Sequence, residues 1–473
     1  MVFSSTIFLV YFLPLFLLLY QFIDKQYKNY FILLASIFFY SWGAPKFIFI
    51  LIGSTILDFY VVKALFNSNE EKIRKRLLAF SISMNVGLLV FFKYTNFLLE
   101  NVNAAFGLFN IDPFTWTKIL LPIGISFYTF QTLTYSIDVY RKVHKPLDKL
   151  SDYLLYIMSF PQMIAGPIVR FNLIAKEIIS RDEKTKDKLQ GFIRFSIGLA
   201  KKVLIANVMG AQADLIMNQP VSEIGFLMAW VGILAYTFQI YFDFAGYSDM
   251  AIGLGRMMGF SFPENFNNPY ISKNISEFWR RWHITLGQWM KDYLYIPLGG
   301  NRVDNKMRLY FNLWFVFLIS GLWHGASWNF VLWGAFHGFF LILDRLFLIK
   351  LLNSLGKIPS ILITFLIVMI GWVFFRIEQF SDALAYLRKM FSPSAEGYLE
   401  IIPSFQIILG IAIFFSVITF FDFGKKWEQL VFFNKEMKTP GLVLWTLVGI
   451  FFYIICLMQV TSSDFNPFIY FRF

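Results

Sequence analysis

Residues 309–343 read LYFNLWFVFLISGLWHGASWNFVLWGAFHGFFLIL and contain no Asp, Glu, Lys or Arg. Hydrophobic stretches of about 18 residues or more with few charges predict membrane-crossing helices. Two apolar segments, 308–325 and 328–348, meet here at SGLWHGASW, where Gly and Ser residues flank His324. The whole chain is 57% hydrophobic and 15% charged, whereas soluble domains carry about a quarter charged residues. The composition therefore predicts an all-α, polytopic integral membrane protein.

Apolar stretches recur along the chain and predict about twelve transmembrane helices. Residues 29–41 are short for a crossing, and 151–169 contains two Pro and a Gly, so we expect it to be broken or re-entrant. No soluble domain can be separated, so we expect 1–473 to form a single membrane-embedded domain. The expected spans are 2–23, 29–41, 46–66, 77–99, 117–140, 189–217, 225–257, 308–325, 328–348, 358–376, 403–421 and 441–460.

The net charge of +12 is distributed unevenly between the loops. Loops 63–76, 141–149 and 170–188 are rich in Lys and Arg, whereas 100–116 and 218–224 contain neither. The positive-inside rule predicts that the basic loops are cytoplasmic, which with twelve spans puts both termini outside. We interpret the basic surplus as topology and contact with anionic membrane lipid. No basic folded domain is visible, so we do not expect nucleic-acid binding.

A second unusual stretch, 277–300, reads EFWRRWHITLGQWMKDYLYIPLGG. Its polar residues recur at helical spacing on one face and its aromatic residues on the neighbouring face, which predicts one amphipathic helix of about four turns, ended by Pro297. Trp, Tyr, Arg and Lys are typical of the membrane–water boundary. An interfacial anchor is therefore one interpretation of this helix. His283 falls at the border of the two faces, where a packing role is an alternative to a chemical one.

His324 and His337 are the ionisable residues inside the uncharged stretch, and such residues are costly in a membrane unless they have a function. For both, the alternative is a buried His that bonds a neighbouring carbonyl. No acidic residue near His324 in sequence completes a Ser-His-Asp relay. Cys456 is the only cysteine, and a few His alone make a weak zinc site, so we expect no metal. One remaining chemistry is a neutral imidazole acting as general base on an alcohol that attacks an activated acyl group.

The segments FWRRWHITLGQWMKDYLYIPLGGNR at 278–302 and GLWHGASWNFVLWGAFHG at 321–338 carry a family resemblance. The chain resembles the membrane-bound O-acyltransferase family, and within it the bacterial polysaccharide branch typified by the membrane component of alginate O-acetylation. The likeness is densest between about 120 and 345. Further matching segments are LPIGISFYTFQTLTYSIDVYR at 121–141, FPQMIAGPIVR at 160–170, YFDFAGYSDMAIGLGRMMGFSFPENFNNPY at 241–270 and FIYFRF at 468–473.

The resemblance implies a ring-like fold of tilted, re-entrant and interfacial helices around a central tunnel, in the cytoplasmic membrane of a bacterium. It implies that His324 is the catalytic His and His283 the second His. The donor would be acetyl-CoA, another acyl-CoA or an acyl-carrier thioester, and no bound cofactor is expected. As a hypothesis, the donor tunnel is assigned to Arg280, Arg281, Lys291, Trp282, Trp323 and His337.

The expected function is transfer of an acetyl or other short acyl group from a cytoplasmic thioester to a hydroxyl outside. The acceptor would be an extracellular polysaccharide, or a secreted or periplasmic esterase-like acyltransferase that relays the group. Peptidoglycan O-acetylation and teichoic acid D-alanylation share the mechanism and remain alternatives. A transporter or flippase would use intramembrane acids as an ion relay, with Asp58, Asp138, Asp243 and Asp249 as candidates. A scaffold with merely packed His residues is a third possibility.

Overall fold

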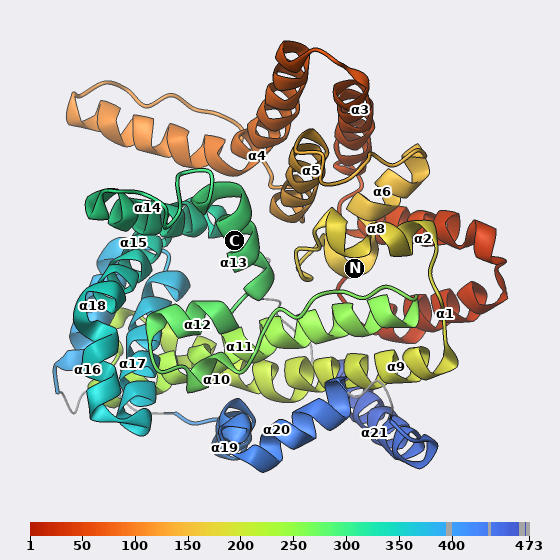
Figure 1. The fold of residues 1–473 in the computed structure, drawn as a ribbon. Coiled ribbons are helices and arrows are strands. Elements are labelled where there is room, and N and C mark those ends of the chain that lie inside the picture. Colours follow the sequence, from red (N-terminus) through yellow and green to blue (C-terminus); the bar gives the residue numbers. More distant parts are fainter. Residues whose placement is uncertain (394–399, 434–436, 463–468, 470–473) are drawn as a thin grey trace. The chain divides into compact units, whose positions relative to one another are not determined.

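A computed structural model describes residues 1–393, 400–433, 437–462 and 469 (Figure 1). Within these residues the regular structure is helical, which confirms the all-α prediction. The chain divides into two compact units, which we describe separately. The first comprises Met1–Phe3, Ile7–Asp182 and Gly259–Phe262, and the second Ser4–Thr6, Glu183–Met258 and Pro263–Phe473.

The first unit is organised around a buried carboxylate, Asp58. Its oxygens accept hydrogen bonds from Ser81 Oγ at 2.5 Å and Tyr153 Oη at 2.6 Å, and from Asn85 Nδ2 at 3.1 Å. The three donors come from two helices, so one acidic side chain ties these helices together without an unmet polar group. The helices are η1 (Ile7–Phe12), α1 (Leu13–Phe22), η2 (Lys25–Tyr27), α2 (Lys28–Gly43), α3 (Ile48–Asn67), α4 (Glu71–Leu108), α5 (Ile125–Tyr140), α6 (Leu150–Met158), α7 (Phe160–Met163) and α8 (Phe171–Ile179).

The second unit contains every histidine that the sequence marks as a site candidate. Its core is rich in large aromatic side chains, including Tyr236, Trp282, Trp333 and Trp372. Its helices are α9 (Thr185–Ala200), η3 (Lys201–Ala206), α10 (Asn207–Met217), η4 (Val221–Glu223), α11 (Phe226–Met257), η5 (Pro269–Ile271), α12 (Ile275–Arg281), α13 (Ile284–Met290), η6 (Lys291–Tyr295), α14 (Lys306–His324), α15 (Trp328–Leu343), η7 (Asp344–Leu348), α16 (Ile349–Leu355), α17 (Lys357–Arg376), α18 (Phe380–Phe391), α19 (Phe405–Val417), η8 (Ile418–Phe420), α20 (Asp422–Glu428), η9 (Gln429–Phe433) and α21 (Thr439–Ser462).

Helices α9 and α11 pack backbone to backbone at two glycine pairs. A Cβ on Gly198 would lie 2.6 Å from the carbonyl oxygen of Gly246, and a Cβ on Gly191 would lie 2.6 Å from that of Gly253. Small residues allow such close approach between apolar helices. Directly after α9, Lys202 Nζ of η3 forms a buried ion pair with Asp243 Oδ1 of α11 at 2.9 Å. The position of α11 is therefore well defined, and α11 supplies one wall of the site described below.

Five helices of the described residues are long and apolar enough to cross a membrane, or six if the bent pair formed by 405–420 and 422–433 counts as one span. The prediction of about twelve spans is not confirmed. Several expected spans are shorter or interrupted helices. For example, the stretch 117–140 is helical only from Ile125, and 29–41 lies within the 16-residue α2. Hydropathy alone counts apolar residues and does not detect where the backbone leaves the helix.

The stretch 151–169 is broken, as predicted. Helix α6 ends at Met158, the four-residue α7 follows, and the chain is non-helical from Gly166 to Arg170. Buried side chains cover most of this stretch, which fits the rule that irregular backbone in membrane proteins is enclosed by protein.

Candidate active site

The segment 277–292 is two short helices joined by a sharp break, and the prediction of one continuous amphipathic helix is wrong. Helix α12 ends at Arg281, Trp282 is extended, and His283 has φ 44° and ψ 53° before α13 begins. A left-handed backbone is uncommon for a residue other than Gly. Its strain is a feature found preferentially at functional sites.

The stretch 265–267 satisfies the backbone groups that the break would leave without partners. The amide of Asn267 donates to the carbonyl of Arg281 at 2.9 Å, and the amide of Ile284 donates to the carbonyl of Asn265 at 2.9 Å. Helix α12 is fixed at its other end as well, because Asp344 Oδ2 accepts hydrogen bonds from the amide and hydroxyl of Ser276, both at 2.7 Å. The break is therefore held by tertiary contacts.

The break turns His283 into the protein interior, where its side chain is 1% exposed. Its Nδ1 lies 3.0 Å from Asn265 Oδ1, and its ring meets the Phe244 ring edge-on with centroids 4.7 Å apart. Burial lowers the pKa of His283 to about 3, so the imidazole is neutral at pH 7. A neutral imidazole keeps one nitrogen able to accept a proton or a hydrogen bond.

His324 is the last residue of α14 and lies in an aromatic enclosure. Its ring centroid is 4.9 Å from that of Trp323, 5.1 Å from Trp333 and 5.2 Å from Phe375. The ring of His283 lies 6.5 Å away. The structure thus brings together the two histidines that the sequence singled out from segments about forty residues apart.

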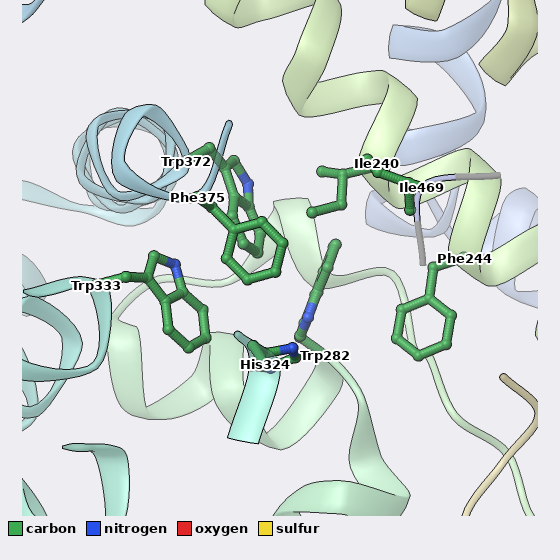
Figure 2. A pocket seen from close by; sticks show the side chains of 8 residues that line it. All are labelled: Ile240, Phe244, Trp282, His324, Trp333, Trp372, Phe375 and Ile469. Atoms are coloured by element: carbon green, nitrogen blue, oxygen red, sulfur yellow. The ribbon is translucent and has the colours of Figure 1, made fainter. Parts of the chain in front are cut away.

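Each of these two histidines lines a cavity of its own. His283 lines a chamber of about 260 Å³, together with Arg280, Lys291 and Trp282. His324 lines a much smaller space of about 10 Å³, room for roughly one water molecule. Figure 2 shows the second cavity, walled by Trp282, Trp333, Trp372 and Phe375 besides His324. Trp282 is among the lining residues of both cavities.

Three of the predicted tunnel residues are not among those that line either cavity. Arg281 pairs with Glu277 at 2.9 Å and donates to the carbonyl of Asn267. Trp323 lies against the rings of both His283 and His324, at 6.0 and 4.9 Å. His337 is fully buried between Trp279 and Trp333, whose ring centroids are 4.9 and 5.0 Å from its own. A tunnel role for these three stays a prediction.

The sequence did not identify two groups of residues at this site. Asn265 carries no periodic signal, although it lies in the quoted segment 241–270. Trp372 and Phe375 lie in the expected span 358–376, and their spacing of three puts both on the face of α17 that meets His324. The repeated large aromatic residues on one face were the available signal. Of the closing FIYFRF motif, only Ile469 lies within the described residues, and its amide donates to Asp243 Oδ2 at 2.8 Å.

Comparison with known proteins shows the family of this chain. Residues 145–351 match the model of MBOAT, the membrane-bound O-acyltransferase family, and this range contains His283 and His324. The chain is 43% identical to the probable alginate O-acetylase AlgI of Pseudomonas aeruginosa over 83% of its own length and 75% of the relative.

The chain belongs to the membrane-bound O-acyltransferase family. It is also 37% identical to the probable alginate O-acetylase AlgI of Pseudomonas putida over the full length of both chains. A peptidoglycan O-acetyltransferase of Helicobacter pylori is 37% identical over 82% of this chain and 80% of the relative. The protein is accordingly a multi-pass membrane O-acyltransferase, as the sequence motifs predicted.

Proposed function

We propose that this O-acyltransferase moves an acetyl group from a cytoplasmic thioester, with acetyl-CoA as the simplest donor, to a hydroxyl of an extracytoplasmic polysaccharide or of an esterase-like relay protein. The observation that carries the proposal is the pair of cavities that meet at Trp282, one lined by His283 and one by His324. A reaction between two substrates that arrive from different sides requires two such spaces close together.

His324 is the general base of the proposed reaction. Its imidazole takes the proton of the acceptor hydroxyl as the hydroxyl oxygen attacks the thioester carbonyl carbon. The tetrahedral intermediate then collapses with cleavage of the carbon–sulfur bond, and the thiolate leaves with the proton from the imidazolium. An ester and a thiol result, and no oxidant, reductant or metal is consumed. The aromatic enclosure supports this role because it excludes bulk water, which would otherwise hydrolyse the thioester.

The larger chamber is the proposed donor site. Arg280 and Lys291 lie among its lining residues, and cations at the mouth of a chamber attract an anionic donor such as coenzyme A. The remaining lining is largely apolar, with Leu286, Met290 and Val316 among its residues, and suits an uncharged acyl-bearing arm.

The wider setting follows the predicted topology. In the proposed arrangement about twelve spans and re-entrant segments form a ring around the tunnel, in the inner membrane of a bacterium, with the basic loops in the cytoplasm. Labelling of single cysteines in a Cys456→Ala background tests this orientation. Labelling of residue 110 from the cytoplasmic side alone would contradict it.

The acceptor is an exported polysaccharide in the leading proposal, supported by the two alginate O-acetylase relatives. Peptidoglycan is the second candidate, because the Helicobacter pylori relative is similarly identical and covers most of both chains. Teichoic acid D-alanylation would use the same geometry with a different acyl group. An ion relay for transport is disfavoured, because Asp58 is surrounded by hydrogen-bond donors and Asp249 pairs with Arg194 and Lys201 at 2.5 and 2.6 Å.

Deletion of the gene tests the function as a whole. Base-labile acetyl groups would be measured on exported polysaccharide and, separately, on purified peptidoglycan, with the wild-type gene restored as a control. Loss of polysaccharide acetylation alone is the expected result. Loss from peptidoglycan alone would transfer the proposal to that polymer, and unchanged acetylation of both would overturn it.

A further inference from the structure

The side chain of Asn265 is 1% exposed and touches the active site without lining either cavity. Its Nδ2 lies 3.1 Å from Ser248 Oγ on α11. Its Oδ1 faces three groups of the broken helix: Thr285 Oγ1 at 2.9 Å, the Thr285 amide nitrogen at 3.4 Å and His283 Nδ1 at 3.0 Å.

The orientation of this carboxamide is fixed by chemistry. A backbone N–H can only donate, so the end of Asn265 that faces Thr285 must be the oxygen. The same oxygen faces His283 Nδ1, and an oxygen without a hydrogen can only accept. Nδ1 of His283 therefore carries the ring proton, and in the neutral ring Nε2 is left with a lone pair.

The other nitrogen of His283 is placed to use that lone pair. Within the described part of the chain, Nε2 has no hydrogen-bond partner, although the residue is almost fully buried. A buried polar atom without a partner is costly, and such atoms are commonly explained by a role in catalysis or by a bound group. His283 lines the 260 Å³ chamber, where a substrate could supply the missing donor.

We propose that Asn265 is a positioning residue that fixes His283 as the Nδ1–H tautomer, so that Nε2 acts as an acceptor toward a hydroxyl, thiol or amide N–H of a substrate. This inference rests on the proposed function and deepens it. A proton-bearing Nε2 would stabilise the negative oxygen of the intermediate, but the tautomer excludes that role for His283. His283 then differs from His324 in kind: it accepts one hydrogen bond in a fixed geometry.

Few charged or titratable groups of the described residues lie near His283. His324 of α14 lies 6.5 Å away, and Arg280 of α12 with Lys291 and Tyr295 of η6 line the same chamber. On α11, the ring of Phe244 contacts the ring of His283. Asp249, which is also on α11, is paired with Arg194 and Lys201. The described contacts give His283 no carboxylate partner. Replacement of the Asn265 amide by a carboxylate would introduce one and favour the imidazolium.

The test reads the tautomer directly. The chain has four His, so ¹⁵N-histidine labelling and magic-angle-spinning NMR in lipid give few signals, and the His283→Ala variant assigns those of His283. We expect a protonated Nδ1 and an unprotonated Nε2 in the wild type. In Asn265→Ala we expect mixed tautomers and a turnover number reduced about 10- to 100-fold. The lost hydrogen bonds to Ser248 and Thr285 should also lower the melting temperature, so the tautomer and the turnover number are both measured below the unfolding transition. In Asn265→Asp, His283 should become protonated about one to three pH units higher than in the wild type.

Asn267→Asp is the matched control, because it makes the same change on an exposed residue of the same segment, where Arg281 is the neighbouring group. It should leave the His283 signals unchanged. A wild-type His283 protonated at Nε2, or Asn265→Ala with wild-type tautomer and turnover, would overturn the inference. The tautomer is read without turnover, so an inactive wild-type protein would count against the proposed function alone.

Discussion

His324 and His337 come from the same uncharged stretch and are both buried, but their surroundings differ. His324 ends α14 and lines a cavity, whereas His337 lies inside α15 between two Trp rings. A Cβ on Gly371 would lie 2.7 Å from His337 Nε2, so the neighbouring helix closes over that ring. Burial and a membrane setting are therefore insufficient to identify a functional His. In the proposed mechanism, the cavity beside His324 is what separates the two.

Replacement of His324 should have the largest effect on activity. Loss of a general base typically lowers the rate by about 10²–10⁴. We expect His324→Gln to lose acyl transfer to that extent while its melting temperature stays near that of the wild type, because Gln fills much of the same volume. The initial rate with acetyl-CoA and the thermal unfolding of the purified protein measure both quantities. Wild-type rates would remove His324 from the chemistry.

His283→Ala should have a smaller effect, since in our account His283 accepts one hydrogen bond from a substrate. Loss of one buried hydrogen bond costs about 1–3 kcal/mol, which corresponds to roughly 5- to 150-fold in rate. The same initial-rate assay measures the change. A loss as large as that of His324→Gln would show that His283 does more than orient a substrate.

Arg280 and Arg281 offer a matched comparison, because adjacent residues of one helix have different surroundings. Arg280→Glu should raise the KM for acetyl-CoA roughly 5- to 30-fold at low salt, because it reverses a charge in the chamber. This increase corresponds to a loss of about 1–2 kcal/mol in binding free energy. High salt should reduce the difference. Arg281→Glu, which breaks the ion pair with Glu277, should mainly lower the melting temperature. Equal KM effects in both variants would contradict a donor chamber at Arg280.

His337→Phe should lower the melting temperature slightly and change the rate of acyl transfer by less than about threefold. Phe has a similar volume to His, and such substitutions are well tolerated in a packed core. Its neighbours Trp279 and Trp333 already form an aromatic cluster that accepts another ring. A strong loss of transfer in a stably folded His337→Phe protein would place this residue in the reaction and remove the contrast with His324.

The pH dependence of stability tests the buried state of His283 without any measurement of activity. The pKa of His283 is lowered from 6.5 to about 3 in the folded protein, so the unfolded chain binds the extra proton between these values. The contribution of His283 to stability is therefore fully present above pH 6.5 and declines as the pH falls toward 3, by at most about 1.4 kcal/mol per pH unit. The melting temperature of His283→Asn should depend less steeply on pH in this window. Parallel curves would contradict the buried, neutral state.

The sequence was sufficient to predict an all-α membrane protein and the two histidines that meet at the site. His324 stands out because charge is absent around it, and His283 because its segment is rich in Trp and Arg. The break at Trp282 and His283 could not be predicted, because the backbone groups that it leaves open are hydrogen-bonded by residues 265–267, which belong to a separate segment of the chain. Periodicity describes a helix in isolation and carries no information on such partners.

The separation of roles among the predicted tunnel residues also depends on tertiary structure. Arg280 and Arg281 are neighbours in sequence, yet only Arg280 is among the residues lining the chamber. Similarly, the expected span 117–140 is largely apolar but is helical only from Ile125. Hydropathy reports the environment of a segment, and the local backbone is set by what packs against it.

Chemical rescue tests the central claim, that His324 rather than His337 acts as the base, most directly. Transfer from acetyl-CoA would be measured for purified His324→Gly and His337→Gly, with and without added imidazole at pH 8, where imidazole is mostly neutral. We predict that His324→Gly is almost inactive and that imidazole restores a concentration-dependent part of its rate, whereas imidazole leaves the rate of His337→Gly unchanged. Wild-type activity of His324→Gly without imidazole, or rescue of His337→Gly alone, would contradict the account.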